Sequence, residues 1–216
     1  KVRALILAPL FPTLSNLFTF KIIEVSIMAK ITAAMVKELR DRTGSGMMEC
    51  KKALTETGGD VDAAIELMRK SGAASAEKKA DRAAAEGALL IRNDDKFGLI
   101  VEINCETDFV TKNEDFSNFS NKVADLAFEK RAISIEDIAD IEIDGQPLEE
   151  ARTALVAKIG ENITVRRLAS IEANGTIGAY VHGVRIAAIV DVEGGDADLA
   201  RDIAMHVAAT NPVCVD

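Results

Sequence analysis

Cysteine and histidine are scarce in this sequence. Three cysteines and two histidines occur among 216 residues, and no two cysteines form a CxxC pair. An odd, scattered set of cysteines fits reduced cytosolic thiols better than a disulfide framework or a zinc site. The histidines are too few and too scattered for a histidine-rich metal centre. We therefore expect a cytoplasmic protein that binds no metal and no other cofactor. The residues concerned are Cys50, Cys105, Cys214, His182 and His206.

Positive charge is in deficit. Lysine and arginine number 26 against 35 aspartates and glutamates, which gives a formal net charge of −9. The electrostatic field of a protein with this negative net charge repels phosphate backbones and acidic membrane surfaces. We therefore expect no direct nucleic-acid partner and no membrane partner. The hydrophobic fraction of 48% is ordinary for a globular protein and allows one or two domains with a core.

The N-terminal apolar stretch is too short and too interrupted for a membrane span. Residues 4–20 contain Pro9 and Pro12, and a spanning helix needs roughly 20 apolar residues. A basic start resembles a targeting segment, yet no A-x-A cleavage pattern follows, and transit peptides usually carry more arginine. We favour Met28 as the natural start, with residues 1–27 a disordered extension outside the fold.

From Met28 the apolar spacing becomes helical. Residues 28–72 predict three short amphipathic helices: Gly44 can end the first, Ser45 can cap the second and Asp60 the third. A core of this size is close to the minimum for independent stability. We therefore expect this three-helix module to dock on a partner.

The rest of the chain predicts an α+β fold. Residues 73–87 are alanine-rich with alternating charge, which is typical of an exposed helical connector at a domain boundary. Residues 88–146 begin with a period of two, which predicts a hairpin, and continue with a helix capped by Asn113. Residues 147–216 predict a helix, three strands joined by short turns and a last helix. Because the chain stops after that helix, we expect an antiparallel-sheet core whose second half, 147–216, is incomplete.

Catalytic motifs fail when they are tested. In TGSGMMECKK, Cys50 stands where a phosphate-binding loop needs its second glycine, directly before the lysine. Glu49 takes the place of the third glycine of a dinucleotide-binding pattern, and no strand precedes it. Nor does the sequence place a histidine beside Cys105 as a base. We expect no enzyme.

Two adjacent methionines open the second helix of the module. Methionine at helical spacing is normally part of a core, and this remains an alternative for Met47. Neighbouring residues on a helix point about 100° apart, however, so the two side chains cannot both be fully buried on one face. We expect one of Met47 and Met48 at the surface, where a flexible thioether suits a partner.

The tetrapeptide TDFV, residues 107–110, leaves two interpretations open. Taken alone, Thr107 caps a helix, Asp108 favours the positive end of that helix, and Phe109 enters the core. Against this, the periodic aromatic stripe of the following helix begins at Phe116 and already supplies the core, and Phe109 stands outside it.

From Met28 onward the chain resembles the bacterial elongation factor Ts family, the guanine-nucleotide exchange factors of elongation factor Tu. One pair of stretches is similar to the family's ubiquitin-associated-like module, and NCETDFVTKNEDF is similar to its exchange motif. These stretches follow the family's order through most of residues 28–212. They are VKELRDRTGSGMMECKKAL with GGDVDAAIELMRKSG, then KKADRAAAEG, NCETDFVTKNEDF, LVAKIGENITVRR, YVHG and DLARDIAMHVAATNP.

The resemblance implies which residues contact elongation factor Tu. In the family, the helical module lies against the nucleotide-binding domain of that partner, and the Asp-Phe pair enters between helices near its magnesium site. The KIG turn and the histidine of the HG turn also face the partner. The matching positions are Met47, Met48, Lys51, Thr107, Asp108, Phe109, Val110, Ile159, Gly160 and His182.

Some of these residues have simpler interpretations without the resemblance. Lys51 would be a solvated lysine, Ile159 a core residue and His182 a histidine at the end of a strand with no assigned task. The family also continues beyond the NP turn, where residues 213–216 leave its pattern. We therefore expect a C-terminally truncated member with exposed strand edges in residues 163–212. A homodimer is possible in the complete protein.

The implied function is translation elongation without covalent catalysis. The protein would bind elongation factor Tu with GDP bound, promote GDP release by disturbing the magnesium and phosphate site, and remain on the nucleotide-free partner. An alternative is a passive protein-binding module, in which the three-helix unit recruits a ubiquitin-like or other helical partner without exchange activity.

Overall fold

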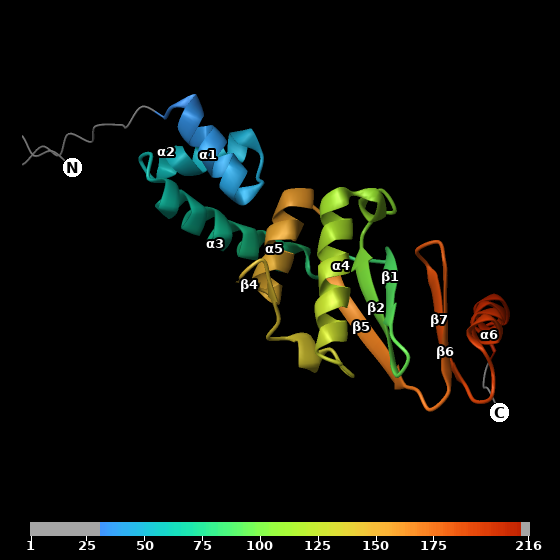
Figure 1. Cartoon of the computed structure of the whole chain (residues 1–216). Helices are drawn as coiled ribbons and strands as arrows, with labels where there is room; N and C mark the ends of the chain where they lie inside the picture. The colour runs from blue at the N-terminus through green and yellow to red at the C-terminus, as the bar shows by residue number, and fades with distance from the viewer. Residues whose placement is uncertain (1–30, 213–216) are drawn as a thin grey trace, which may run out of the picture. The chain divides into compact units, whose positions relative to one another are not determined.

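A computed structural model of the chain describes residues 31–212. The predictions for residues 1–27, the start at Met28, Cys214 and the last four residues lie outside this described part. The chain divides into two compact units after Glu66, and each unit is described by itself (Figure 1). Within residues 31–212 no helix combines the length and the apolar character that crossing a membrane requires.

The first unit is helical. It contains α1 (Ala33–Thr43), α2 (Met47–Glu56) and the first residues of α3 (Val61–Lys79). Gly44 ends α1 with a φ of 64°, as predicted. Asp60 also caps α3 as predicted, because its Oδ1 accepts a hydrogen bond from the backbone nitrogen of Ala63 at 2.9 Å. The buried side chains of this unit are Val36, Leu39, Cys50, Ala53, Leu54 and Ala64.

The predicted cap of α2 is wrong by one residue. Gly46 is the N-cap, with φ −64° and ψ 145°, and no side chain caps the helix. Ser45 instead belongs to the turn: its backbone nitrogen donates to Thr43 Oγ1 at 3.4 Å, and its carbonyl accepts from the Cys50 thiol at 3.8 Å. The serine therefore stabilises the approach to the helix rather than its first turn.

Helix α3 is longer than the third helix that the sequence predicts. It runs without a break through Gly72 to Lys79, and residues 80–85 are not helical. Because alanine and lysine are strong helix formers, residues 73–79 extend the helix despite the glycine. Only the first half of the predicted connector 73–87 is helical, and a domain boundary at residue 72 remains a prediction.

The second unit contains a three-stranded antiparallel sheet. Its strands are β1 (Glu86–Asn93), β2 (Phe97–Cys105) and β5 (Ile163–Glu172), in the order β1-β2-β5. The predicted hairpin is β1 and β2. Asp94 stabilises its turn, because Asp94 Oδ1 accepts from the backbone nitrogens of Lys96 and Phe97, both at 2.9 Å.

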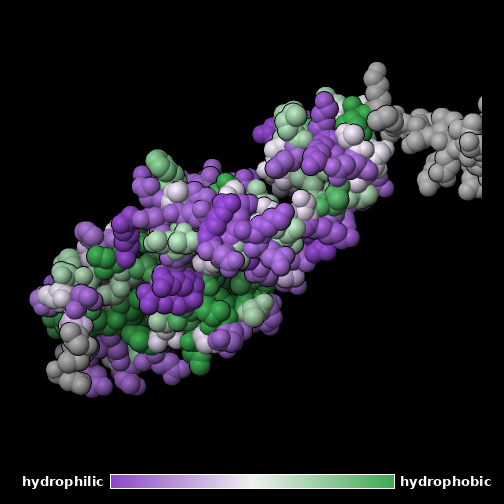
Figure 2. Space-filling model, turned by 180° about the vertical axis from the view of Figure 1, so that it is seen from behind, coloured by the Kyte–Doolittle hydropathy of each residue, from purple (hydrophilic) through white to green (hydrophobic). Residues whose placement is uncertain are grey.

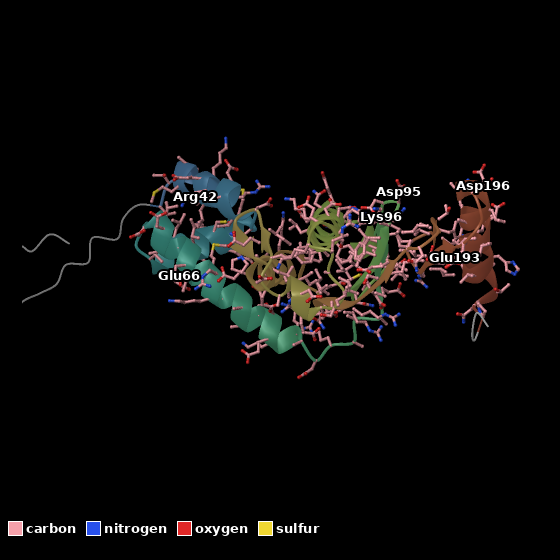
Figure 3. The ribbon with its side chains drawn as sticks, turned by 60° about the horizontal axis from the view of Figure 1, so that its bottom comes forward. Arg42, Glu66, Asp95, Lys96, Glu193 and Asp196 are labelled. Carbon is pink, nitrogen blue, oxygen red and sulfur yellow. The ribbon has the colours of Figure 1, made fainter. Side chains whose placement is uncertain are left out.

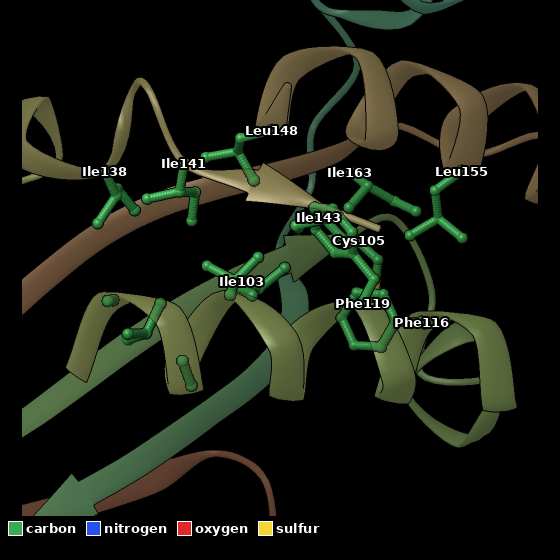
Figure 4. Packing of buried hydrophobic residues seen from close by; sticks show 14 of the residues in the cluster. Ile103, Cys105, Phe116, Phe119, Ile138, Ile141, Ile143, Leu148, Leu155 and Ile163 are labelled. Atoms are coloured by element: carbon green, nitrogen blue, oxygen red, sulfur yellow. The ribbon is translucent and has the colours of Figure 1, made fainter. Parts of the chain in front are cut away.

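One face of this sheet carries the main core. Helix α4 (Glu114–Glu129) covers it and is capped by Asn113 as predicted, since Asn113 Oδ1 accepts from the backbone nitrogen of Asp115 at 2.8 Å. Phe116 and Phe119 of α4 pack among residues of the sheet and of α5 (Leu148–Ile159) (Figure 4). Two short segments between these helices add to the cluster, with Ile138 from η2 (Glu136–Ile138) and Ile143 from β3 (Glu142–Ile143). Strand β4 (Gln146–Pro147) pairs with β3 and is exposed.

The last three elements form a further layer. Strands β6 (Thr176–His182) and β7 (Ile186–Val192) pair only with each other within residues 31–212, and α6 (Ala197–Thr210) packs on them. The hairpin lies between α6 and the β1-β2-β5 sheet (Figure 1), with Ile189 against Gly98 of β2. The fold class is therefore α+β, as the sequence predicts.

Large apolar side chains remain at the surface of this last layer. Apolar surface gathers on the part of the second unit that carries the C-terminal elements (Figure 2). Because this hairpin pairs only with itself in the described part of the chain, no other strand of that part lies along its two outer edges, in agreement with the expected exposed edges. The exposed residues are Val181, Val184, Ile186, Leu199 and Met205.

Candidate functional site

The TDFV segment forms a tight turn where β2 ends. The backbone nitrogen of Val110 donates to the carbonyl of Thr107 at 3.3 Å. Val110 is also the first residue of the short 3-10 helix η1 (Val110–Lys112). Thr111 Oγ1 then donates to the carbonyl of Asp108 at 2.7 Å. Both hydrogen bonds span Phe109 and hold the backbone around it.

This turn exposes its aromatic residue and buries its aliphatic one. The side chain of Phe109 is 77% exposed, whereas that of Val110 is 6% exposed and belongs to the main core. Asp108 is also exposed. The interpretation in which Thr107 caps a helix and Phe109 enters the core is therefore wrong: Asn113 caps α4, and Val110 rather than Phe109 anchors the turn.

A second candidate segment lies beside this turn. Gly160 ends α5 with a φ of 90°, and its nitrogen donates to the carbonyl of Val156 at 2.9 Å. Cys105 and Ile163 face each other at the end of the β2-β5 ladder. Because that pairing brings the chain before Ile163 next to the chain after Cys105, the KIG turn and the TDFV turn share one end of the sheet. Ile159 is half-buried and Gly160 exposed.

Glu161 joins the two turns, and sequence reasoning did not select it. Its carboxylate accepts hydrogen bonds from the backbone nitrogens of Glu106, at 3.1 Å, and Thr107, at 2.9 Å. The Thr107 hydroxyl also donates to Glu161 Oε1 at 2.7 Å. The only signal in the sequence was an acidic residue directly after a helix-ending glycine, and its partners lie 54 and 55 residues away.

His182 lies at the end of β6, next to the tip of the β6-β7 hairpin. It is exposed, and its Nδ1 lies 3.0 Å from the hydroxyl of Tyr180. Two contacts hold the hairpin tip against β1: Leu89 nitrogen donates to the carbonyl of Val184 at 3.0 Å, and Arg185 pairs with Glu86 at 2.5 Å.

These contacts place the hairpin tip at the same end of the sheet as the TDFV turn. Glu86 is the β1 residue opposite Cys105 in the β1-β2 register. The β1-β2 turn, where Asp95 and Lys96 lie (Figure 3), is at the other end of these strands. The TDFV turn and the KIG turn are thus joined through Glu161, and His182 lies at the same end of the sheet. We call this region the turn cluster: residues 107–110, 159–160 and 182.

The remaining predicted residues belong to the helical unit. Met47 is 55% exposed and Met48 is 77% exposed, so both methionines, rather than one, are at the surface. Lys51 is exposed as well, while Cys50 between them is fully buried. The unit thus presents one side of α2 outward and keeps the other for its own core.

Cys105 is buried beneath the turn cluster. Its thiol donates to the carbonyl of Thr107 at 3.2 Å. Burial, together with the negative charges of Glu161, Glu86 and Asp108, raises the pKa of the Cys105 thiol to about 11. A thiol that holds its proton so firmly is a poor nucleophile at neutral pH. What the structure shows of Cys105 is a hydrogen bond that supports the TDFV turn from below.

Comparison with known proteins places this sequence in a family. A family model described as elongation factor TS matches residues 106–216, which include the TDFV turn, the KIG turn and His182. A protein called elongation factor Ts from Thioalkalivibrio sulfidiphilus is 56% identical over 190 residues, which cover 86% of this chain and 65% of that protein. Proteins of the same name from Idiomarina loihiensis and Arthrospira platensis are each 54% identical.

The matches cover a larger share of this chain than of the relatives. The match to the Idiomarina protein covers 84% of this chain and 62% of that protein, and the match to the Arthrospira protein covers 88% and 78%. The chain thus spans a little under two thirds of the length of the first of these relatives. More than half of the aligned residues are identical, and the family model matches residues 106–216. The chain therefore belongs to the elongation factor Ts family.

Proposed function

We propose that this chain is a translation elongation factor that binds elongation factor Tu carrying GDP and promotes release of the GDP. It would do so without covalent chemistry and in the cytoplasm, by disturbing the site that holds magnesium and the phosphates. The observation that carries the proposal is the TDFV turn, where a 77% exposed phenylalanine stands beside an exposed aspartate on a hydrogen-bonded support.

Burial of the exposed Phe109 side chain against a partner would contribute favourable free energy to binding. Burying a phenylalanine side chain contributes roughly 1.5 to 3 kcal/mol. Two turns and the buried Val110 already fix the backbone around Phe109, so little further ordering is needed on binding. Asp108 adds a negative charge that would compete for the groups around a magnesium ion.

Thermodynamic linkage sets the size of the effect. Magnesium bridges the phosphates of a bound guanine nucleotide, so a partner that displaces the ion or the phosphate loop weakens nucleotide binding. To raise the nucleotide dissociation constant a thousandfold, this chain must bind the nucleotide-free partner about 4 kcal/mol more tightly than the loaded one. Phe109 alone cannot supply that difference.

Further contacts are therefore part of the proposal. Ile159, Gly160 and His182 belong to the same turn cluster as Phe109 and would contact the same partner. Thr107 and Val110 would support the turn from within. Met47, Met48 and Lys51, all exposed on α2, would form a separate contact with the nucleotide-binding domain.

The test is release of fluorescent GDP from elongation factor Tu at increasing concentrations of the 216-residue chain. We expect a saturable acceleration, and a large loss of it in the double variant Asp108→Ala, Phe109→Ala. Ile133→Ala is a matched control, because Ile133 is an apolar residue with 68% exposure that lies outside the turn cluster.

A passive binding module is the alternative. The two exposed methionines of α2 are compatible with it as they are with exchange, but the family to which the chain belongs does not favour it. It predicts association with elongation factor Tu at an unchanged rate of GDP release, and loss of all association when residues 28–72 are deleted. Acceleration by the intact chain would reject this candidate. Association without acceleration would reject exchange, and an absence of association would reject both exchange and passive recruitment of elongation factor Tu.

A further inference from the structure

Two glutamates connect the TDFV turn and the KIG turn in opposite directions. The Glu161 carboxylate accepts three hydrogen bonds from Glu106 and Thr107, as described above. In return, Glu106 Oε1 accepts from the backbone nitrogen of Asn162 at 2.6 Å. Each acidic side chain therefore binds the backbone of the other segment. We call these four hydrogen bonds the glutamate brace.

The brace also reaches the chain that follows α3. Glu106 Oε1 lies 3.5 Å from a guanidinium nitrogen of Arg82. The side-chain amide of Asn162, which is 2% exposed, donates to the carbonyls of Ala80 and Arg82 at 3.2 Å and 2.9 Å. Three segments that are distant in sequence thus meet behind the TDFV turn, and a buried amide fixes one of them.

The brace begins where the sheet ladder ends. The last paired residues of β2 and β5 are Cys105 and Ile163, so strand pairing does not need Glu161. Residues 106 and 107 lie beyond the ladder, and their backbone nitrogens have the Glu161 carboxylate as their partner. Hydrogen bonds to an ionised carboxylate are about twice as strong as those between neutral groups. The carboxylate therefore holds the chain at the point where it leaves the sheet.

We propose that Glu161 is a positioning residue, which sets the TDFV turn in its binding geometry and makes residues 107–110 and 159–160 move as one rigid unit. This inference rests on the proposed exchange function. It assigns a task to a residue that would not itself need to touch the partner. Without the brace, the same contacts remain available, but residues 106–110 must be ordered at the moment of binding.

The cost of that ordering defines the expected effect. Val110 stays anchored in the core without the brace, so the part of residues 106–110 that must be ordered anew is mainly Glu106 and Thr107, whose backbone nitrogens lose their partner. We expect Glu161→Ala to weaken binding to nucleotide-free elongation factor Tu about tenfold. Glu161→Gln keeps an oxygen for the backbone nitrogens but loses the charge and one acceptor, so its loss should be smaller.

A local measurement separates positioning from general instability. Amide hydrogen exchange of the full chain should lose protection at Glu106 and Thr107 in Glu161→Ala, while Ile103 inside the ladder keeps its protection. The matched control is Glu129→Ala, which removes an exposed glutamate at the end of α4 and should change neither region. If Glu161→Ala does not fold, Glu161→Gln serves for the same comparison.

A double-variant cycle links the brace to the aromatic residue. If Glu161 acts by positioning Phe109, Glu161→Ala should weaken binding about tenfold in the natural background and less than about twofold when Phe109→Ala is already present. Equal losses in both backgrounds would overturn the inference. So would unchanged protection at residues 106 and 107, or unchanged affinity when that protection is lost.

Failure of the proposed function would look different. If the unaltered chain neither binds elongation factor Tu nor accelerates GDP release, the proposed function and the functional part of this inference are both wrong. The hydrogen-exchange comparison needs no partner and decides independently whether Glu161 holds residues 106 and 107.

Discussion

Arg185, at the tip of the β6-β7 hairpin, pairs with Glu86 at the start of β1 at 2.5 Å. The pair and the neighbouring hydrogen bond from Leu89 to Val184 tie the hairpin tip, and with it His182, to the end of the sheet that carries the TDFV turn. The position of His182 therefore depends on a contact that crosses 99 residues of sequence.

Removal of this ion pair should loosen the tip without unfolding the protein. The Arg185 side chain is 67% exposed, so Arg185→Ala should cost less than about 1 kcal/mol of unfolding free energy. Hydrogen exchange at the Leu89 amide should rise several-fold, because its acceptor lies in the released turn. Arg201→Ala, at an exposed position of α6, should leave that amide unchanged; equal effects of the two variants would contradict this assignment.

The stability of the protein should depend strongly on one phenylalanine of the second unit and hardly at all on another. Phe116 is fully buried in the core beneath α4, so Phe116→Ala should lower the free energy of unfolding by about 3 to 5 kcal/mol. Phe109→Ala should change it by no more than about 0.5 kcal/mol, because that side chain is already in water. Urea titrations of both variants check this, and a large loss in Phe109→Ala would show that the residue supports the fold.

Glycines 178 and 72 form a second contrasting pair. A Cβ on Gly178 would lie 2.0 Å from the Ala200 carbonyl oxygen of α6, so Gly178→Ala must displace that helix and should cost at least about 2 kcal/mol. A Cβ on Gly72 of α3 would meet Ala157 at an ordinary 3.5 Å. Because alanine favours helix, Gly72→Ala should stabilise by up to about 1 kcal/mol. Thermal unfolding should move in opposite directions for the two variants.

The raised pKa of Cys105 predicts a loss of stability at alkaline pH. Its folded-state pKa is raised to about 11, mainly by burial, whereas an unfolded cysteine titrates near its ordinary value of 9.0. Between these values the folded state keeps a proton that the unfolded state has released, so stability falls as pH rises. Below pH 9 this contribution is fully present. Urea titrations from pH 8 to 11 should show a shallower decline in Cys105→Ala than in the unaltered chain, and identical declines would contradict the raised pKa.

Local signals in the sequence located several elements correctly. Asn113 and Asp60 act as helix caps and Gly44 ends α1, because each of these features depends on residues within one turn. Ser45 fails for a related reason: either Ser45 or Gly46 could precede α2, and only the backbone shows which one adopts the capping conformation. Helix α3 continues through Gly72, since good helix formers on both sides outweigh one glycine.

Long-range pairing explains what the sequence did not reveal in the candidate site. Exposure of Phe109 follows from burial of its neighbour Val110, which depends on the core that α4 and the sheet build together. The role of Glu161 depends on the register that sets Cys105 opposite Ile163. A single sequence contains no local mark of that register, so a glutamate beside a turn could not be distinguished from a solvated one.

Release of labelled GDP from elongation factor Tu tests the central claim most directly. The unaltered chain should accelerate release in a saturable manner, the double variant Asp108→Ala, Phe109→Ala should lose most of that acceleration, and Ile133→Ala should retain it. Equal acceleration by the unaltered chain and a folded double variant would contradict the assignment of the TDFV turn. An unaltered chain that forms the complex yet leaves the release rate unchanged would contradict the exchange function itself.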